Sequence, residues 1–224
     1  MTSASLKEKE SPMHNTMIDA TVLELLASRI CHDLISPVGA VNNGVEFLED
    51  MGADAGDEAI ALISMSAQAA AARLQVFRLA YGAGGRDPNI KPWDIHKTFD
   101  NLITADGKIK QNWDARAVFA DVELPEGFCK ILTATLMLAA ECMPKGGAIG
   151  VTHENGETRV IAGGPDAAPR AQVKEALAVE LDPADLDPRL VHPFATGILG
   201  RQYGLDITIE KAGDSMVTFL IKRA

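Results

Sequence analysis

Arg29-Ile30-Cys31-His32-Asp33-Leu34-Ile35-Ser36-Pro37 is the stretch that decides how this 224-residue chain folds. It lies in a longer segment whose apolar residues are three or four positions apart, which predicts an amphipathic helix. Pro37 should distort that helix, because it has no N–H to bond the carbonyl of Asp33, at a cost of roughly 3 kcal/mol. A distortion close to a histidine with an acidic neighbour indicates that the surroundings of His32 are shaped for chemistry.

The direction of His32 follows from the apolar pattern of the helix. The predicted buried row is Leu23, Leu26, Ile30, Leu34, Val38, Val41, Val45 and Leu48. At about 100° per residue, His32 lies some 160° from Leu34 and should face solvent. The small residues on its side are Ser28, Ser36, Gly39 and Asn43, with Leu25 and Ile35 at the edges. An exposed, uncrowded histidine is expected of a nucleophile that acts on another macromolecule; the alternative is a surface histidine on a bent helix.

The pair His32 and Asp33 suits covalent catalysis. Imidazole is largely neutral, and therefore nucleophilic, near pH 7. Asp33 can hold one ring nitrogen and leave the other free to attack. A phosphoryl group is a suitable electrophile, because its transfer needs mainly an in-line nucleophile and neutralisation of charge. The sequence offers no group for that neutralisation, so a metal would have to come with the partner.

The run His32-Asp33-Leu34-Ile35-Ser36-Pro37 resembles the H-box of sensor histidine kinases. The longer run 28–50, together with 74–82, resembles more narrowly the ChpT family of alphaproteobacterial histidine phosphotransferases. On this resemblance, His32 accepts a phosphoryl group from the receiver domain of a hybrid histidine kinase and passes it to response regulators. Asp33 would orient His32 and manage its proton, and Mg²⁺ would be held by the receiver. The implied receiver-binding residues are Arg29, Ile35, Ser36, Gly39 and Asn43.

Charge and cysteine content limit the classes of partner and compartment. The net charge of −10 opposes binding to nucleic acid or to an anionic membrane. No run approaches 18 apolar residues and the N-terminus lacks a signal pattern, so we expect no membrane span. The three cysteines, Cys31, Cys129 and Cys142, form no CxxC or His/Cys cluster and predict reduced thiols in the cytoplasm.

The N-terminal third predicts a helical hairpin. Residues 1–18 are mostly polar and show no apolar periodicity, so we expect them to be disordered. Helices should follow over 20–50 and 57–81. The second helix has its own apolar row: Ile60, Ile63, Ala67, Ala70, Leu74 and Phe77. A lone hairpin leaves apolar surface uncovered, so residues 19–82 should pair with a second copy into a four-helix bundle. The alternative is that both helices pack on their own C-terminal domain.

Residues 89–224 predict a second domain, beyond a glycine-rich linker at 82–88. Expected helices are 92–103, 125–143, 170–179 and 188–203, and expected strands are 109–115, 148–153, 157–162, 206–211 and 215–222. Helices beside a mostly antiparallel sheet give an α+β sandwich. The whole chain should therefore be an α+β protein with an N-terminal hairpin that dimerises.

The second domain is similar in layout to the ATP-binding domain of histidine kinases. Those kinases carry an Mg²⁺-binding asparagine six residues before the proline of Met143-Pro144-Lys145-Gly146-Gly147, where this chain has Leu138. They also carry an adenine-binding aspartate where this chain has Ala162, and a glycine-rich lid where residues 191–204 resemble a plain helix. We therefore expect no ATP and no cofactor.

The sequence also predicts the roles of two other histidines and leaves alternative functions open. His153 and His192 have no neighbours at metal-ligand spacing, so we expect structural roles for both. A relay without ATP binding is the favoured function. The alternatives are a scaffold that binds receivers without phosphorylation and, less favoured, an ATP-dependent kinase.

Overall fold

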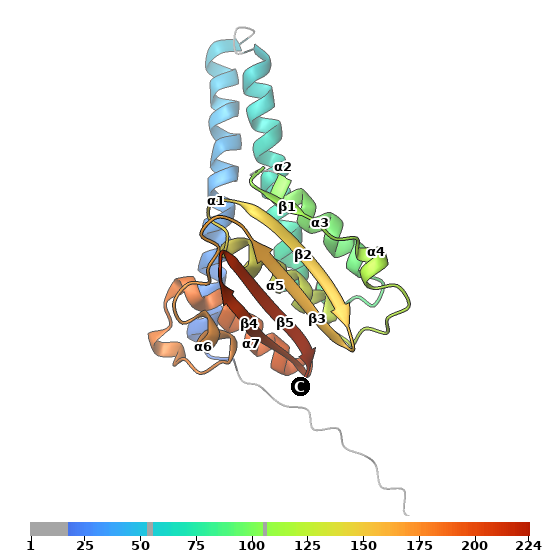
Figure 1. The fold of residues 1–224 in the computed structure, drawn as a ribbon. Coiled ribbons are helices and arrows are strands. Elements are labelled where there is room, and N and C mark those ends of the chain that lie inside the picture. Colours follow the sequence, from blue (N-terminus) through green and yellow to red (C-terminus); the bar gives the residue numbers. More distant parts are fainter. Residues whose placement is uncertain (1–17, 53–55, 105–106) are drawn as a thin grey trace, which may run out of the picture.

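The computed structural model describes residues 18–52, 56–104 and 107–224 (Figure 1). The hairpin extends away from a C-terminal unit in which helices cover one side of a twisted sheet. The predicted disorder of residues 1–18 concerns a segment of which only Ile18 is described. The fold is α+β, as predicted.

The hairpin consists of α1 (Ala20–Met51) and α2 (Gly56–Ala80), close to the predicted ranges. Asp19 caps α1, because its carboxylate accepts a hydrogen bond of 2.7 Å from the N–H of Thr21. The helix continues through Pro37 rather than ending there. Gly44 permits the close approach of the two helices, since a Cβ at this position would lie 2.6 Å from Cγ1 of Ile63.

The apolar rows predicted to be buried are largely exposed on the upper part of the hairpin. Val38, Val45, Ile60 and Leu74 are 40–58% exposed. Leu23, at the start of α1, is exposed as well. The reason is geometric: α1 and α2 can cover only one side of each other, and the C-terminal unit reaches only the base of the hairpin. A single chain therefore leaves these residues exposed, as expected of a lone hairpin, and their burial by a second copy stays a prediction.

The helix α2 is more apolar than the sequence analysis allowed. An 18-residue window of it has a mean hydropathy of 1.3, so it is, among the described residues, long and apolar enough to cross a membrane. Length and composition do not separate a membrane helix from one that packs on protein. The expectation of no membrane span rested on uninterrupted apolar runs, whereas α2 reaches this length with a few polar residues among the apolar ones, so that expectation stays a prediction.

The base of the hairpin belongs to the core of the C-terminal unit. Val76, Phe77, Leu79 and Ala80 of α2 are buried together with residues of the sheet and its helices. The fully buried Lys130 donates hydrogen bonds from Nζ to the carbonyls of Ala80 (3.0 Å) and Gly82 (2.6 Å). Carbonyls at the C-terminal end of a helix lack partners within the helix, and Lys130 provides one.

The C-terminal unit contains five strands and several helices. The α-helices are α3 (Pro92–Thr104), α4 (Ala115–Val118), α5 (Phe128–Glu141), α6 (Val173–Leu177) and α7 (Val191–Gln202). Short 3-10 helices cover η2 (Ala83–Arg86), Pro183–Asp185 and Pro188–Leu190. The strands are β1 (Ile109–Gln111), β2 (Gly147–Glu154), β3 (Glu157–Gly163), β4 (Leu205–Gly213) and β5 (Met216–Arg223). Their order in the sheet is β1-β2-β3-β5-β4. Only the β1–β2 pair is parallel, so the predicted mostly antiparallel sheet is confirmed.

Several predicted elements differ from the structure in their bounds: the helices predicted over 170–179 and 188–203 are Val173–Leu177 and Val191–Gln202, and two further differences have a local cause. The strand predicted over 109–115 ends at Gln111, because Asp114 accepts hydrogen bonds from the N–H groups of Arg116 and Ala117 and begins α4. The helix predicted from Pro125 begins at Phe128, because Gly127 before it is left-handed, with φ of 75°. A Cβ at Gly127 would also lie 2.4 Å from the ring of Tyr203.

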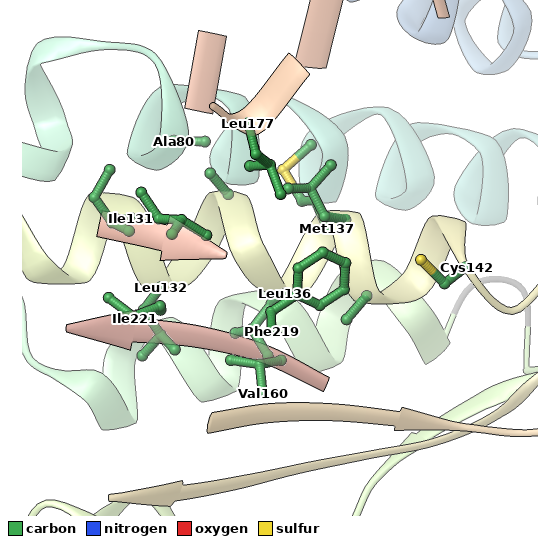
Figure 2. Close-up of a cluster of buried hydrophobic side chains, with 14 of the residues drawn as sticks. Ala80, Ile131, Leu132, Leu136, Met137, Cys142, Val160, Leu177, Phe219 and Ile221 are labelled. Atoms are coloured by element: carbon green, nitrogen blue, oxygen red, sulfur yellow. The ribbon is translucent and has the colours of Figure 1, made fainter. Parts of the chain in front are cut away.

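The core lies on both sides of α5 (Figure 2). On one side Leu132 and Leu136 meet Val160, Phe219 and Ile221 of the sheet. On the other side Ile131 and Met137 lie toward α2 and α6, which contribute Ala80 and Leu177. The helix α5 is therefore the central layer between the sheet and the base of the hairpin.

Candidate functional site

His32 lies on the outer side of α1, as predicted. Its side chain is 88% exposed, and its Nδ1 is 3.4 Å from Oδ1 of Asp33. The carboxylate of Asp33 is half-buried. Because Asp33 approaches Nδ1, the lone pair of Nε2 remains free to attack an electrophile from solvent.

The residues next to His32 on α1 are mostly small and leave the surface open to a partner. Ile35, Ser36 and Asn43 are exposed, with Ile35 at 69%. A Cβ at Gly39 would meet no atom within 4 Å, so a partner can approach the backbone here. The positions follow His32 at intervals of three or four residues, which places them along one side of the helix. The structure thus brings four of the five predicted receiver-binding residues onto one surface.

Arg29, the fifth of these residues, turns away from that surface. Its Nη2 is 2.5 Å from Oε1 of Glu141, the last residue of α5. Its Nε is 3.9 Å from Oδ2 of Asp33, one turn later on α1. The side chain is only 21% exposed. Arg29 therefore joins the helix that carries His32 to the C-terminal unit.

Glu141 has a second partner, His192. The Nδ1 of His192 is 2.7 Å from the same Oε1, and the ring is completely buried in the first turn of α7. Burial by itself would raise the pKa of Glu141, but His192 and Arg29 hold this pKa below its ordinary value. Glu141 is therefore a carboxylate anchored between α1 and α7.

Tyr81 closes the buried side of this cluster. Its ring meets the ring of His192 edge-on, with centroids 5.8 Å apart. Burial raises the pKa of Tyr81 above its ordinary value. Neither the hydroxyl of Tyr81 nor Nε2 of His192 has a hydrogen-bond partner within the described part of the chain. Among the described residues, the ring of His192 therefore has one hydrogen-bond partner, which is Glu141.

A cleft of about 400 Å³ opens beside Asp33 at the base of the hairpin. Its walls come from α1, α2, α3, β1 and α5. Four basic residues line it: Arg29, Arg73, Lys108 and Arg170. The acidic residues in its lining are Asp33 and Glu141. In a chain with a net charge of −10, this is a local concentration of positive charge close to the histidine.

The positions at which kinases contact nucleotide are filled by core side chains. Leu138 is 3% exposed and Ala162 is completely buried. The two remaining histidines have protein partners, since His153 Nδ1 lies 2.8 Å from Oγ1 of Thr158 and His192 contacts Glu141. Within the described residues, no three His, Cys, Asp or Glu side chains are grouped as metal ligands.

Neither Glu141 nor the basic cleft was predicted from the sequence. A signal for Glu141 existed, since it is the only acidic residue in the mostly apolar helix Phe128–Glu141 and such a charge needs a partner. No comparable signal existed for Arg73, Lys108 and Arg170, which lie far apart in the sequence and meet only through the packing of α2 on the C-terminal unit.

Comparisons with known proteins identify the family of this chain. Residues 92–215 match the family described as histidine phosphotransferase C-terminal domain. The protein phosphotransferase ChpT of Brucella abortus (strain 2308) is 35% identical over 198 residues, which cover 86% of this chain and 91% of that protein. A solved structure of a bacterial phosphotransferase has a TM-score of 0.73 at 30% identity and covers 92% of this chain and 98% of its own. This chain therefore belongs to the ChpT-like histidine phosphotransferase family.

Proposed function

We propose that this protein relays phosphoryl groups through His32 between receiver domains. One receiver, on a hybrid histidine kinase, would supply the phosphoryl group, and the receiver of a response regulator would take it. Membership in the family supports phosphotransfer in a phosphorelay. The observation that carries the assignment to His32 is its 88% exposure beside Asp33.

The chemistry at His32 is a pair of in-line displacements. Nε2 attacks the phosphorus of an aspartyl phosphate, the N–P bond forms, and the bond from phosphorus to the aspartate oxygen breaks to release a carboxylate. The proton on Nδ1 stays between the ring and Asp33, which stabilises the positive charge that develops on the imidazole. The reverse displacement on a second receiver regenerates neutral His32. Magnesium bound by the receiver would neutralise the phosphoryl oxygens.

We propose that receivers dock on the surface formed by Ile35, Ser36, Gly39 and Asn43. Ile35 supplies apolar area next to the nucleophile, and the other three are small enough to admit a partner. The basic lining of the neighbouring cleft, including Arg73 and Lys108, favours an acidic partner. Arg29 would act at the edge of this surface, because its guanidinium is engaged with Glu141.

We also propose that the protein is a homodimer through the hairpin. Val38 and Val45 of α1 and Ile60 and Leu74 of α2 are large exposed apolar residues. At about 100° per residue, Val38 and Val45 lie 120–140° from His32, so a second copy on this face leaves the histidine free. Pairing of two hairpins into a four-helix bundle would cover these residues. The C-terminal unit contacts only the base of the hairpin and leaves them uncovered.

A cytoplasmic location is the remaining part of the proposal. The three cysteines are free, as expected of a reducing compartment. The net charge of −10 opposes an encounter with nucleic acid.

The decisive experiment is transfer of radiolabelled phosphate from a phosphorylated receiver domain to the purified chain. We expect label that is acid-labile and base-stable, as phosphohistidine is, and no label on His32→Ala. The variant should keep its fold, because the residue is exposed and alanine favours the helix. Label on His32→Ala would refute the assignment to His32. A wild-type chain that binds the receiver but takes no label would support the scaffold instead.

A further inference from the structure

Two carboxylates compete for the guanidinium of Arg29. The Nη2–Oε1 distance to Glu141 is 2.5 Å, which is a direct charge-assisted hydrogen bond. The Nε–Oδ2 distance to Asp33 is 3.9 Å, too long for a hydrogen bond. Arg29 is therefore hydrogen-bonded to Glu141 and makes only a longer ion pair with Asp33.

Glu141 is held where it can retain Arg29. Its Oε1 also contacts His192 at 2.7 Å, and the ring of His192 is fixed by complete burial and by the edge of Tyr81. These contacts come from α7 and from the residue that follows α2. Glu141 cannot follow Arg29 toward Asp33 without losing the partner of a buried histidine.

We infer that Glu141 is a positioning residue for phosphotransfer at His32, which it serves by keeping Arg29 away from Asp33. This inference rests on the proposed function of His32. Arg29 and Asp33 are four residues apart on one helix, a spacing at which opposite charges pair readily. Without the charge of Glu141, Asp33 is the anion next to Arg29, and a direct pair would draw its carboxylate from Nδ1 of His32. The C-terminal unit would thus set the geometry of a nucleophile on the hairpin.

The consequence for the chemistry lies in the tautomer of His32. An Asp33 carboxylate at Nδ1 favours the N–H on that nitrogen and leaves the lone pair on Nε2, the exposed nitrogen. An Asp33 paired with Arg29 removes that preference and no longer stabilises the imidazolium. Fewer molecules then present a free Nε2, and the transition state loses part of its electrostatic support.

Glu141→Gln and Glu141→Asp separate charge from shape. Glutamine keeps the length of the side chain but loses the charge, whereas aspartate keeps the charge and leaves a gap. We expect Glu141→Gln to slow single-turnover transfer from a phosphorylated receiver by about tenfold, a part of the 10²–10⁴-fold typical of acid–base assistance. Glu141→Asp should be impaired less. If the aspartate variant is the more impaired of the two, Glu141 acts through packing and the inference fails.

Two further measurements test whether Glu141 affects His32 through Asp33. Nitrogen-15 shifts of the His32 ring, recorded where the imidazole is neutral, should show a lower share of the Nδ1–H tautomer in Glu141→Gln. In an Asp33→Asn background, Glu141→Gln should cause no additional loss of rate. Unchanged nitrogen shifts, or fully additive losses of rate, would overturn the inference even if transfer is slowed.

The control is Glu210→Gln, which removes a carboxylate paired with Arg159 on the sheet. It should transfer at the wild-type rate. The outcomes also separate this inference from the proposed function. A wild-type chain that takes no label refutes the relay, whereas an active wild type with an equally active Glu141→Gln refutes only the role of Glu141.

Discussion

Lys130 Nζ donates a hydrogen bond of 3.0 Å to the carbonyl of Ala80, the last residue of α2. A second bond, of 2.6 Å, goes to the carbonyl of Gly82. The lysine is 1% exposed and lies in the first turn of α5. A buried ammonium is costly unless it is paired, so the end of the hairpin and the C-terminal unit stabilise each other at this point.

Lys130→Met should therefore destabilise the protein. Two carbonyls would lose a charged donor, at about 1–3 kcal/mol each, and removal of the buried charge would offset part of this, so we expect a net loss of about 2 kcal/mol in unfolding free energy. Urea unfolding followed by circular dichroism measures it. The control is Lys145→Met, whose ion pair with Asp166 is exposed and should contribute within about 0.5 kcal/mol. Equal stability of the two variants would show that the Lys130 bonds do not hold the units together.

Asp33→Ala should slow phosphoryl transfer without abolishing it. His32 would keep its exposure but lose the group that holds its Nδ1 proton, and such assistance is typically worth about 10²–10⁴-fold in rate. Rapid-quench measurement of single-turnover transfer from a labelled receiver tests this. The control is Glu46→Ala, which removes an exposed acid on the same helix whose carboxylate accepts a hydrogen bond from Asn42, and it should transfer at the wild-type rate. A wild-type rate in Asp33→Ala would remove Asp33 from the mechanism.

Ile35→Asp should weaken receiver binding strongly and leave thermal stability nearly unchanged. Ile35 is 69% exposed beside the nucleophile, and interface energy concentrates in a few central residues. Calorimetry with an unphosphorylated receiver domain gives the Kd, and the control is Ile18→Asp, which lies just before the start of α1 and is also exposed. An unaffected Kd would mean that receivers dock on a different surface. A fall of many degrees in Tm would mean instead that Ile35 is buried in the dimer.

Val45→Glu should convert the protein into a monomer. Val45 is 40% exposed on the face that we propose for pairing, and a buried unpaired carboxylate there would be strongly unfavourable. Sedimentation equilibrium measures the mass. Phe47→Glu is the matched control. Phe47 is 48% exposed and lies two residues after Val45, about 160° from it around the helix. If both variants keep the wild-type mass, the hairpin face is not the interface.

The fold was largely predictable from periodicity, and the site only in part. The two long helices, the mixed sheet and the exposure of His32 follow from local patterns of apolar residues. The partner of Arg29 does not, because Glu141 is 112 residues away and the two meet only through the packing of the hairpin against the C-terminal unit. Burial of the upper hairpin stays a prediction, since the pattern records apolar residues and not whether their cover comes from the same chain or from a second copy.

The protein should not bind ATP. Leu138 and Ala162 stand where the kinase pattern needs a magnesium-binding amide and an adenine-binding carboxylate, and both lie in the core, 3% and 0% exposed. Aliphatic side chains offer no lone pair to a metal and no acceptor to an adenine amino group, and each unpaired group in a desolvated site would cost about 1–3 kcal/mol.

The net charge of −10 adds further repulsion toward a polyanionic nucleotide. Calorimetry with millimolar Mg-ATP should give no saturable heat, and the chain incubated alone with labelled ATP should stay unlabelled while it still takes label from a phosphorylated receiver. Leu138→Asn should not create binding, because Ala162 would still lack the carboxylate. Micromolar affinity of the wild type would instead make this protein a kinase that starts a relay.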